Sequence, residues 1–229
     1  MNVTAHRLIK PAKEQRVFFC GDVHGNYSRL QEQLSEIGFL IGEDILILTG
    51  DIIDRGSENK EMIEFVASTP EVYSVLGNHE MMFLNAISDE LVRTVYTEPR
   101  MGGGWIEKYS QTELEGMATL IESCMSIAIT VEKGTHKIGV IHAAAPISWK
   151  EVLLPTPDNI EYHLWSREQF EEAKSGEQTL PILEVDLVVH GHVCNEILTS
   201  GNQIWIDTHW VTGKLSIIES EHLIEHIVS

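Results

Sequence analysis

The stretch VYSVLGNHE, residues 72–80, joins a short apolar run to four polar or permissive residues. Its first part, Val72 to Leu76, is dominated by valine, tyrosine and leucine and is typical of a buried strand. A strand that ends in GNHE brings an amide, an imidazole and a carboxylate to the same edge of a sheet. The stretch therefore predicts a strand that delivers polar groups to a site shared with other parts of the chain.

The same pattern, an apolar run followed by a polar loop, recurs along the sequence. Further examples are VFF at 17–19 before GDVHGN, ILIL at 45–48 before TGDIIDRGS, IGVI at 138–141 before HAAAP, and LVV at 187–189 before HGHVCN. Each run is short and bounded by turn residues, so each is predicted to be a strand. Two more strands are expected around residues 204–206 and 215–218.

Between the predicted strands, apolar residues recur at helical spacing. A helix is expected from Tyr27 to Ile37, with Asn26 as its N-cap and Gly38 just past its end. A second helix is expected around Met62–Val66, with Ser57 as its cap. Longer segments, at 80–95 and 106–125, are mainly helical and are separated by three glycines at 102–104. This alternation indicates a layered α/β fold, in which ligand sites gather at the carboxyl ends of strands.

Length and charge restrict the class of protein and its partners. A chain of 229 residues with 43% hydrophobic residues fits one domain, here 1–229, with the motif-bearing core at 16–218. The formal net charge of −19 argues against a nucleic acid or an anionic membrane surface as a partner. We therefore expect neither nucleic acid nor membrane among the partners, and the charge itself indicates a solvated acidic surface.

Cysteine usage and the N-terminus indicate the compartment. Cys20, Cys124 and Cys194 are odd in number and widely spaced, which suits reduced thiols better than a disulfide framework. The first residues, MNVTAHRLIKPAKEQ, lack the apolar run of a signal peptide, and no stretch approaches a membrane span. We expect a cytoplasmic protein.

The five polar loops together offer the ligands of a divalent metal. Their candidate side chains are Asp22, His24, Asp51, Asp54, Arg55, Asn78, His79, His142, His190 and His192. Carboxylate, imidazole and amide oxygen suit ions such as Mn, Fe, Zn or Co, whereas the absence of cysteine from the set argues against a structural zinc site. His190 lies two residues before His192 and is expected to point away, into packing.

Three blocks in this order, GDVHG, GDIIDRG and GNHE, resemble the signature blocks of the calcineurin-like metallophosphoesterases, and more narrowly of the phosphoprotein phosphatase family. The later segments IHA, LWSR, HGH and WIDT resemble the bacteriophage lambda protein phosphatase and its bacterial relatives. The resemblance covers roughly residues 16–218. It implies a calcineurin-like α/β sandwich, a central β-sandwich flanked by helices.

The resemblance also implies a two-metal site and assigns residues to it. Asp22 and His24 hold the first ion, Asp51 bridges both ions, and three further residues complete the second, namely Asn78, His142 and His192. His79 is the implied general acid, oriented by Asp54. The implied phosphate ligands are Arg55, Arg167 and Asn78; Arg167 alternatively belongs to a solvated surface run with nearby glutamates.

The implied activity is hydrolysis of phosphomonoesters on protein Ser or Thr, with Tyr as a further option, by direct attack of a hydroxide held between two divalent ions. The ions are expected to be Mn²⁺, with Fe, Zn, Co or Ni as alternatives, and the partner is a phosphorylated protein or peptide. Two alternatives stay open: a dinucleoside-polyphosphate hydrolase of the same family, and a metal-binding scaffold with little turnover. The oligomeric state is not predicted.

Three positions depart from the pattern of the lambda-like relatives. The chain reads Ala143-Ala144-Ala145 where an Asp and an aromatic residue usually follow the HA pair, which leaves the shape of the substrate lip open. His209 and Trp210 stand where glycine usually follows the IDT sequence, and are expected to narrow or re-aim the pocket. Val193 replaces threonine after HGH, which is expected to change a hydrogen bond behind His192.

Overall fold

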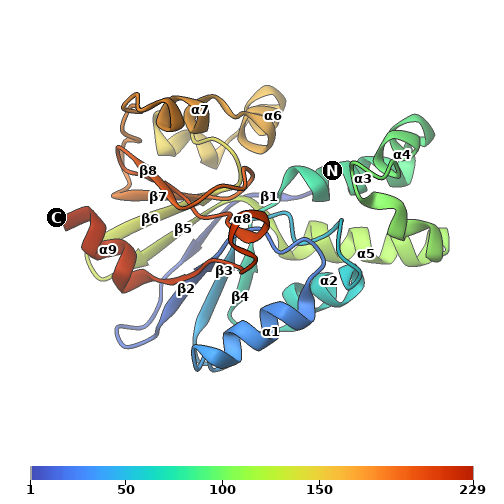
Figure 1. The fold of residues 1–229 in the computed structure, drawn as a ribbon, viewed down its shortest axis with the longest axis horizontal. Coiled ribbons are helices and arrows are strands. Elements are labelled where there is room, and N and C mark those ends of the chain that lie inside the picture. The colour runs from blue at the N-terminus through green and yellow to red at the C-terminus, as the bar shows by residue number, and fades with distance from the viewer. Residues whose placement is uncertain (1, 229) are drawn as a thin grey trace.

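The computed structural model describes residues 2–228, and within them two β-sheets pack as a sandwich with helices on both outer faces (Figure 1). The larger sheet has the strand order β1-β5-β6-β7-β9-β8 and the smaller has the order β10-β2-β3-β4. The strands are β1 (Thr4–Ile9), β2 (Val17–Cys20), β3 (Ile45–Leu48), β4 (Val72–Ser74), β5 (Ser126–Lys133), β6 (His136–Ile141), β7 (Leu187–His190), β8 (Leu198–Ser200), β9 (Gln203–Trp205) and β10 (Ile217–Glu219). The predicted mixed α/β sandwich is confirmed.

The strands of the smaller sheet are apolar on both faces because both faces are covered. In β2, Val17 and Phe19 join the core between the two sheets, whereas Phe18 and Cys20 face the helices outside. β3 divides in the same way, with alternate residues on opposite faces. A continuous apolar run such as ILIL is therefore what a parallel strand buried on both sides requires.

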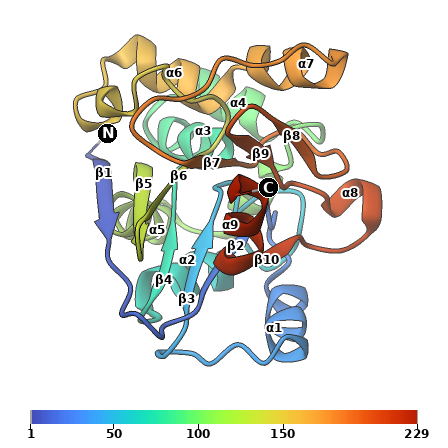
Figure 2. The same ribbon diagram turned by 90° about the vertical axis from the view of Figure 1, so that its left-hand side faces the viewer.

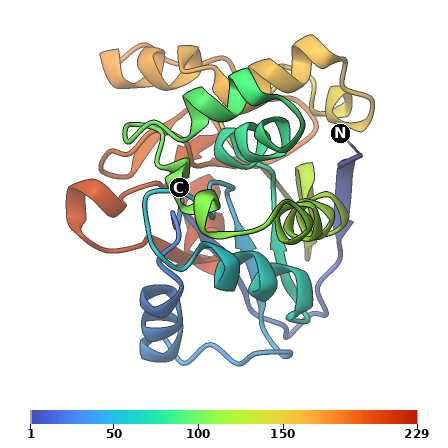
Figure 3. The ribbon, with the colours of Figure 1, turned by 90° about the vertical axis from the view of Figure 1, so that its right-hand side faces the viewer.

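Helices from the first half of the chain cover the smaller sheet. They are α1 (Tyr27–Glu36), α2 (Asn59–Ser68), α3 (Asn78–Ser88), α4 (Glu90–Tyr96), the 3₁₀ helix η1 (Gly103–Lys108) and α5 (Gln111–Cys124). Figure 3 shows α2 to α5, in cyan to light green, gathered on one side of the molecule. Leu30, Met62, Phe83 and Leu114 from four of these helices join one buried cluster with the outer residues of β2 and β3.

The remaining helices belong to the second half of the chain. They are the 3₁₀ helix η2 (Trp149–Leu153), α6 (Pro157–Trp165), α7 (Glu168–Ser175), α8 (His209–Thr212) and α9 (Ser220–Val228). η2 places Trp149 and Val152 in a buried cluster on the outer face of the larger sheet, and α7 packs Phe170 against Trp205. Figure 2 shows α6 and α7 together at the top of the molecule, with β1 at the free end of the larger sheet.

Parallel pairing sends the loops of interest to a common end of the sandwich. β2, β3 and β4 pair in parallel, and so do β6 and β7. The two sheets are joined beyond β4, where Val75 forms a parallel bridge with Ser126 and the Leu76 amide donates to the Ser126 carbonyl at 2.8 Å. The carboxyl ends of strands from both sheets thereby meet above one site.

The strand predictions agree with the structure within two residues, and so does the first helix with its N-cap at Asn26 and Gly38 beyond its end. The predicted cap at Ser57 is wrong, because α2 begins at Asn59 and Glu58 occupies the cap position. The Asn59 side chain closes the loop before α2 by accepting from the Asp54 amide at 2.6 Å and donating to the Gly56 carbonyl at 3.0 Å.

Several elements were not predicted from the sequence. The strands β1, β5 and β8 were missed, as were all helices from α6 to α9. A signal for α6 is present, because Thr156 and Asn159 form a capping box around Pro157 at the first turn. Within residues 2–228, the helices are too short or too polar for any of them to traverse a lipid bilayer.

Candidate metal and phosphate site

The loops that follow β2, β3, β4, β6 and β7 converge at one end of the sandwich. They carry the predicted site residues Asp22, His24, Asp51, Asp54, Arg55, Asn78, His79, His142 and His192. Direct contacts link these loops, such as Thr49 to Asp22 at 3.1 Å and His142 to Asn78 at 2.9 Å. The structure thus brings together residues that are up to 170 positions apart, as in the 3.0 Å contact between the His192 amide and Asp22.

The backbone of these loops is held in a conformation that non-glycine residues rarely adopt. The φ angles are positive at His24 (49°), Asp51 (48°), Asp54 (73°), Arg55 (66°) and His192 (70°). Each such residue costs of order 1–3 kcal/mol of conformational free energy, and it persists only where the surrounding structure holds it in place. Here the first two loops are hydrogen-bonded to each other, since the His24 amide donates to the Asp51 carbonyl at 2.9 Å. Positive φ at five site residues is the kind of strain that folded proteins keep at functional sites.

Asp51 lies at the centre of the site and is surrounded by imidazoles. Its carboxylate is 3.4 Å from His142 Nε2 and 3.9 Å from the Nε2 atoms of both His24 and His79. Burial alone would raise the pKa of Asp51, but the neighbouring imidazoles hold it well below its usual range. Burial lowers the pKa of His142, yet the Asp51 carboxylate outweighs that effect and raises it to about 10.

Two groups of side chains have the spacing of metal ligands. Ligand atoms of His24, Asp51 and His79 lie within 4.8 Å of one another, and so do those of Asp51, His142 and His192. Asn78 Oδ1 joins the second group, 2.9 Å from His142 Nε2 and 3.0 Å from His192 Nδ1. Asp51 belongs to both groups, which is the position required of a bridging ligand.

The outer nitrogen of each candidate imidazole ligand contacts a backbone carbonyl. His142 Nδ1 is 2.7 Å from Thr49 O, His24 Nδ1 is 3.0 Å from Ile53 O, and His192 Nε2 is 3.3 Å from Trp165 O. A carbonyl accepts only from N–H, so the outer nitrogen of each ring carries a proton and the inner nitrogen is directed into the site. This orientation fits divalent metal ions, which would take the inner nitrogens as ligands.

Asp22 supplies a further buried carboxylate, outside both groups of metal-ligand spacing. It accepts from the His192 amide at 3.0 Å and from the Thr49 hydroxyl at 3.1 Å. Burial raises its pKa well above the usual range, and the neighbouring Asp207 raises it further. Burial also raises the pKa of Asp207 to about 6. Buried carboxylates side by side require compensating positive charge, which divalent cations provide.

His79 and Asp54 form a dyad beside these groups. His79 Nδ1 lies 2.7 Å from Asp54 Oδ2, and its Nε2 faces Arg55, whose guanidinium nitrogen is 3.1 Å away. Burial lowers the pKa of His79, but the carboxylates of Asp51 and Asp54 outweigh it, so that the net pKa is raised. The raised pKa favours the protonated form of the ring, in which Nδ1 is directed to Asp54 and Nε2 to the side of the site where Arg55 lies. Arg55 also contacts His24 Nε2 at 2.7 Å, so its cation lies over the centre of the site.

Arg167 lies at the rim rather than inside the site. It occupies the N-cap position of α7 and is exposed. Burial is the main cause of the lowered pKa of His192, and the charge of Arg167 lowers it further. Arg167 is thus within electrostatic reach of the second ligand group and free to contact an incoming anion.

Glu80 is a site residue whose role sequence reasoning missed. Its buried carboxylate accepts from four backbone amides: Asp51 at 2.9 Å, Ile52 at 2.9 Å, Ile53 at 3.2 Å and Gly77 at 2.8 Å. Burial raises the pKa of Glu80 to about 7, while the Gly77 N–H acts in the opposite direction. The signal was present in the sequence, because glutamate at the third position of a helix commonly returns to the amide before that helix.

Tyr96 and Trp105 were also missed. The Tyr96 hydroxyl and the Trp105 indole N–H both donate to Asp54 Oδ1, at 2.5 Å and 2.7 Å. Nothing in their local sequence connects them to Asp54, since they lie 42 and 51 residues away. The prediction for His190 is confirmed: its ring stacks on Trp205 and its Nε2 contacts Gln203 at 3.1 Å, away from the site.

The three sequence departures have different structural outcomes. Ala143, Ala144 and Ala145 are buried, and the backbone of this run contacts the side chains of His163 in α6 and Gln169 in α7. His209 is buried, whereas Trp210 is 57% exposed with its ring centroid 6.5 Å from that of His24. Val193 packs beside the buried pair Phe170 and Trp205.

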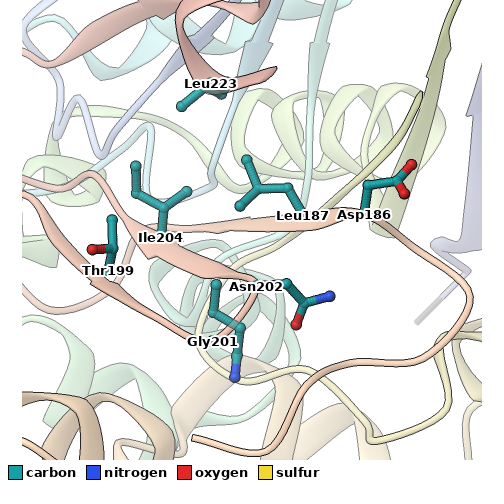
Figure 4. Close-up of a pocket in the computed structure, with 8 residues that line it drawn as sticks. Asp186, Leu187, Thr199, Gly201, Asn202, Ile204 and Leu223 are labelled. Carbon is teal, nitrogen blue, oxygen red and sulfur yellow. The ribbon is translucent and has the colours of Figure 1, made fainter. Parts of the chain in front are cut away.

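A hollow elsewhere on the molecule lacks the chemistry of a site. It has a volume of about 230 Å³ and lies between α9 and the strands β7 to β9 (Figure 4). The one carboxylate in its lining, that of Asp186, accepts from the Lys137 amide at 2.7 Å. Asn202 is likewise engaged with backbone groups at Ile182 and Val185. The converging loops therefore remain the candidate functional site.

Comparisons with known proteins agree with this assignment. A family model described as "Calcineurin-like phosphoesterase" matches residues 15–196. The chain is 32% identical over 213 residues to "Serine/threonine-protein phosphatase 2" of Salmonella typhimurium, covering 90% of this chain and 93% of the relative. It is 42% identical over 65 residues to a symmetrical bis(5'-nucleosyl)-tetraphosphatase of Buchnera aphidicola, covering 28% of this chain and 23% of that protein.

Solved structures share the fold at low sequence identity. A protein serine/threonine phosphatase from Saccharomyces cerevisiae superposes with a TM-score of 0.63 at 15% identity, covering 89% of this chain and 70% of the other. At this identity the likeness concerns the fold alone.

The first prediction concerns the shared position of Asp51. Asp51→Asn should lower the metal content of the purified protein at both ligand groups, because one carboxylate belongs to each of them. Elemental analysis after dialysis against Mn²⁺ measures this. Asp186→Asn, at the opposite end of β7, is the matched control and should retain the wild-type content. Full metal content in Asp51→Asn would show that Asp51 is not a bridging ligand.

The second prediction concerns Glu80. Glu80→Gln keeps the shape but replaces one acceptor oxygen with a donor NH₂ facing backbone N–H groups, so the free energy of unfolding should fall by about 1–3 kcal/mol. Urea unfolding followed by circular dichroism measures this. Glu113→Gln makes the same change at the third position of α5, where the carboxylate is exposed, and should lose less. Equal losses in both variants would contradict the structural role given to Glu80.

Proposed function

Because the chain belongs to the calcineurin-like phosphoesterase family, we propose that it is a metal-dependent phosphomonoesterase acting on phosphorylated serine and threonine residues of proteins or peptides. The observation that supports this most directly is the His79–Asp54 dyad at 2.7 Å, beside an arginine and two groups of metal-ligand spacing. The relative named as a serine/threonine phosphatase, which aligns over nearly the whole chain, supports the substrate class. Phosphotyrosine is a further candidate substrate.

Two divalent cations are the proposed cofactors. His24 and Asp51, which belong to one group of metal-ligand spacing, would hold the first together with Asp22, which is not a member of that group. Asp51 would share the second with Asn78, His142 and His192. Bound divalent ions supply positive charge for the phosphoryl oxygens and lower the pKa of a water molecule. Oxygen and imidazole donors suit Mn²⁺, which we propose as the native ion, with Fe, Zn, Co or Ni as alternatives.

The protein residues would position the phosphate and move one proton. The Arg55 guanidinium contacts His24 and His79, and its planar fork would match two phosphate oxygens there. The Asn78 amide lies beside His142 and His192. Arg167 would approach the same phosphate from the rim. The Nε2–H of His79 would donate to the leaving oxygen of serine or threonine, while Asp54 fixes the ring and stabilises its charge. Phosphoryl transfer needs little beyond such positioning and charge stabilisation.

A second candidate function is hydrolysis of dinucleoside polyphosphates. The short segment of higher identity to a bis(5'-nucleosyl)-tetraphosphatase favours it. A scaffold without turnover is disfavoured, because His79, Asp54 and Arg55 are all present and in mutual contact. Release of phosphate from phosphoserine and phosphothreonine peptides, compared with cleavage of diadenosine tetraphosphate by the same Mn²⁺-loaded protein, tests the proposal. Faster turnover of the dinucleotide would favour the second candidate.

The third prediction concerns Arg167. If its guanidinium contacts the phosphate, Arg167→Ala should raise KM for p-nitrophenyl phosphate and affect bis-p-nitrophenyl phosphate less, because a diester carries one negative charge fewer. The effect on kcat/KM should be roughly 10-fold, as expected for about 1.4 kcal/mol of lost binding. Lys174→Ala removes a cation from the last turn of the same helix and is the matched control. An unchanged monoester-to-diester ratio in Arg167→Ala would place the residue on the solvated surface.

A further inference from the structure

Three glycines at 102–104 and the residues around them have no role in the chemistry described for the site. They belong to the segment Tyr96–Trp105, which leaves α4, turns, and enters η1. This clamp segment makes its main polar contacts with two consecutive residues of another loop, Asp54 and Arg55. Those two residues are the orienting carboxylate of the dyad and the arginine over the site.

The first contact of the clamp segment is with the Asp54 carboxylate. Asp54 is fully buried, and its two oxygens have divided roles: Oδ2 faces His79 Nδ1, and Oδ1 accepts from both Tyr96 and Trp105. A carboxylate with a single partner could rotate about its Cβ–Cγ bond and carry the imidazole with it. Two donors on the opposite oxygen prevent that rotation. Burial and the Asp54 charge raise the pKa of Tyr96, so its hydroxyl stays a donor at neutral and mildly alkaline pH.

The second contact is with the backbone of Arg55. The Arg55 amide donates to the Gly102 carbonyl at 3.3 Å. A Cβ added at Gly102 would lie 2.6 Å from the Arg55 amide nitrogen, and φ at Gly102 is +87°. Only glycine allows the clamp segment to approach this closely. Asp54 and Arg55 both have positive φ, so the segment contacts a pair of residues whose backbone must be held in place.

The clamp segment is itself anchored to the helix that begins with Asn78 and His79. Phe83 of α3 stacks on Trp105 with ring centroids 5.4 Å apart, and lies 6.4 Å from the Tyr96 ring. Gly103 packs on Tyr96 so closely that an added Cβ would lie 2.5 Å from the ring. Gly104 differs from its neighbours, because an added Cβ would meet only the Thr97 carbonyl at 3.6 Å, an ordinary contact.

We propose that the clamp segment Tyr96–Trp105 is a positioning device that fixes Asp54 and Arg55, and through Asp54 the direction of the His79 imidazole. Tyr96 and Trp105 are positioning residues that act on the proton donor without touching substrate. Gly102 and Gly103 are required because the segment must approach Arg55 and Tyr96 closely, whereas Gly104 tolerates a side chain. The expected effect on catalytic rates rests on the proposed phosphatase function. The effect of the clamp segment on the orientation of the His79 ring does not depend on that function.

The kinetic test compares substrates that differ in their need for a proton. The Mn²⁺-loaded Tyr96→Phe and Trp105→Phe variants should lose roughly 10-fold in kcat on a phosphoserine peptide, part of the 10²–10⁴ that general acid catalysis contributes. Their kcat for p-nitrophenyl phosphate, whose leaving group needs no proton, and their KM values should stay near wild type. Tyr109→Phe is the matched control, since Tyr109 packs on the same Trp105 ring at 5.9 Å. Equal losses on both substrates, or no loss on either, would overturn the proposal.

A second readout does not depend on turnover. In protein loaded with diamagnetic Zn²⁺, the proton on His79 Nδ1 should give a downfield proton resonance, identified by its absence from His79→Asn. Tyr96→Phe should shift or broaden it, and Tyr109→Phe should not. An unchanged resonance in Tyr96→Phe would overturn the proposal even if every phosphopeptide proved inert. Inert phosphomonoesters together with a shifted resonance would instead contradict the proposed function and leave the clamp supported.

The glycines provide an independent comparison within three consecutive residues. Gly103→Ala should displace Tyr96 and reproduce the selective loss on the phosphoserine peptide, whereas Gly104→Ala should behave as wild type in both assays. If Gly103→Ala does not fold, the isosteric Tyr96→Phe variant still decides the question. Identical behaviour of folded Gly103→Ala and Gly104→Ala would count against the clamp.

Discussion

One buried carboxylate connects the elements on which the site depends. Glu80 gathers backbone N–H groups from the loop after β3 and from the residue before α3, so that two separate connections become one body. Neither connection could be buried without such an acceptor, because unpaired amides in the interior are costly. Asp51 and His79 take their positions from these two connections, and the Gly77 backbone lies against the Asp51 side chain so closely that no Cβ would fit. Backbone hydrogen bonds to Glu80 therefore set the geometry of the site.

The side chains of the site are oriented by groups that have no catalytic function themselves. Backbone carbonyls of Thr49, Ile53 and Trp165 fix the outer nitrogens of three imidazoles. The carboxylates, in contrast, are buried: burial raises the pKa of both Asp22 and Asp207, and the Asp207 charge raises that of Asp22 further. Ligand side chains that are held in fixed orientations, while the negative charge of the buried carboxylates exceeds what nearby groups neutralise, are typical of a cation site. The same arrangement explains why several carboxylates of this acidic chain are buried at the site.

The strands and the loops after them were predictable from the sequence because their signals are local. The run ILIL at 45–48 is apolar at every position, as strands covered on both faces must be, and the polar residues follow directly. Parallel pairing then brought the loops together as expected. Ser57 failed as a cap because Asn59 engages Asp54 and Gly56 and delays the helix, a contact that local propensity does not report. The roles of Tyr96 and Trp105 depend on contacts across more than forty residues, and the burial of the three alanines depends on helices that the sequence pattern did not reveal.

The left-handed backbone at His24, Asp51, Asp54, Arg55 and His192 has a consequence for how the protein can change. At each of these positions glycine would relieve the steric strain of the left-handed backbone. Each replacement would also delete a side chain that the chemistry needs. Relief of backbone strain and retention of the site are therefore opposed at the same five residues. The backbone strain of this fold is concentrated at the place where its function is proposed to lie.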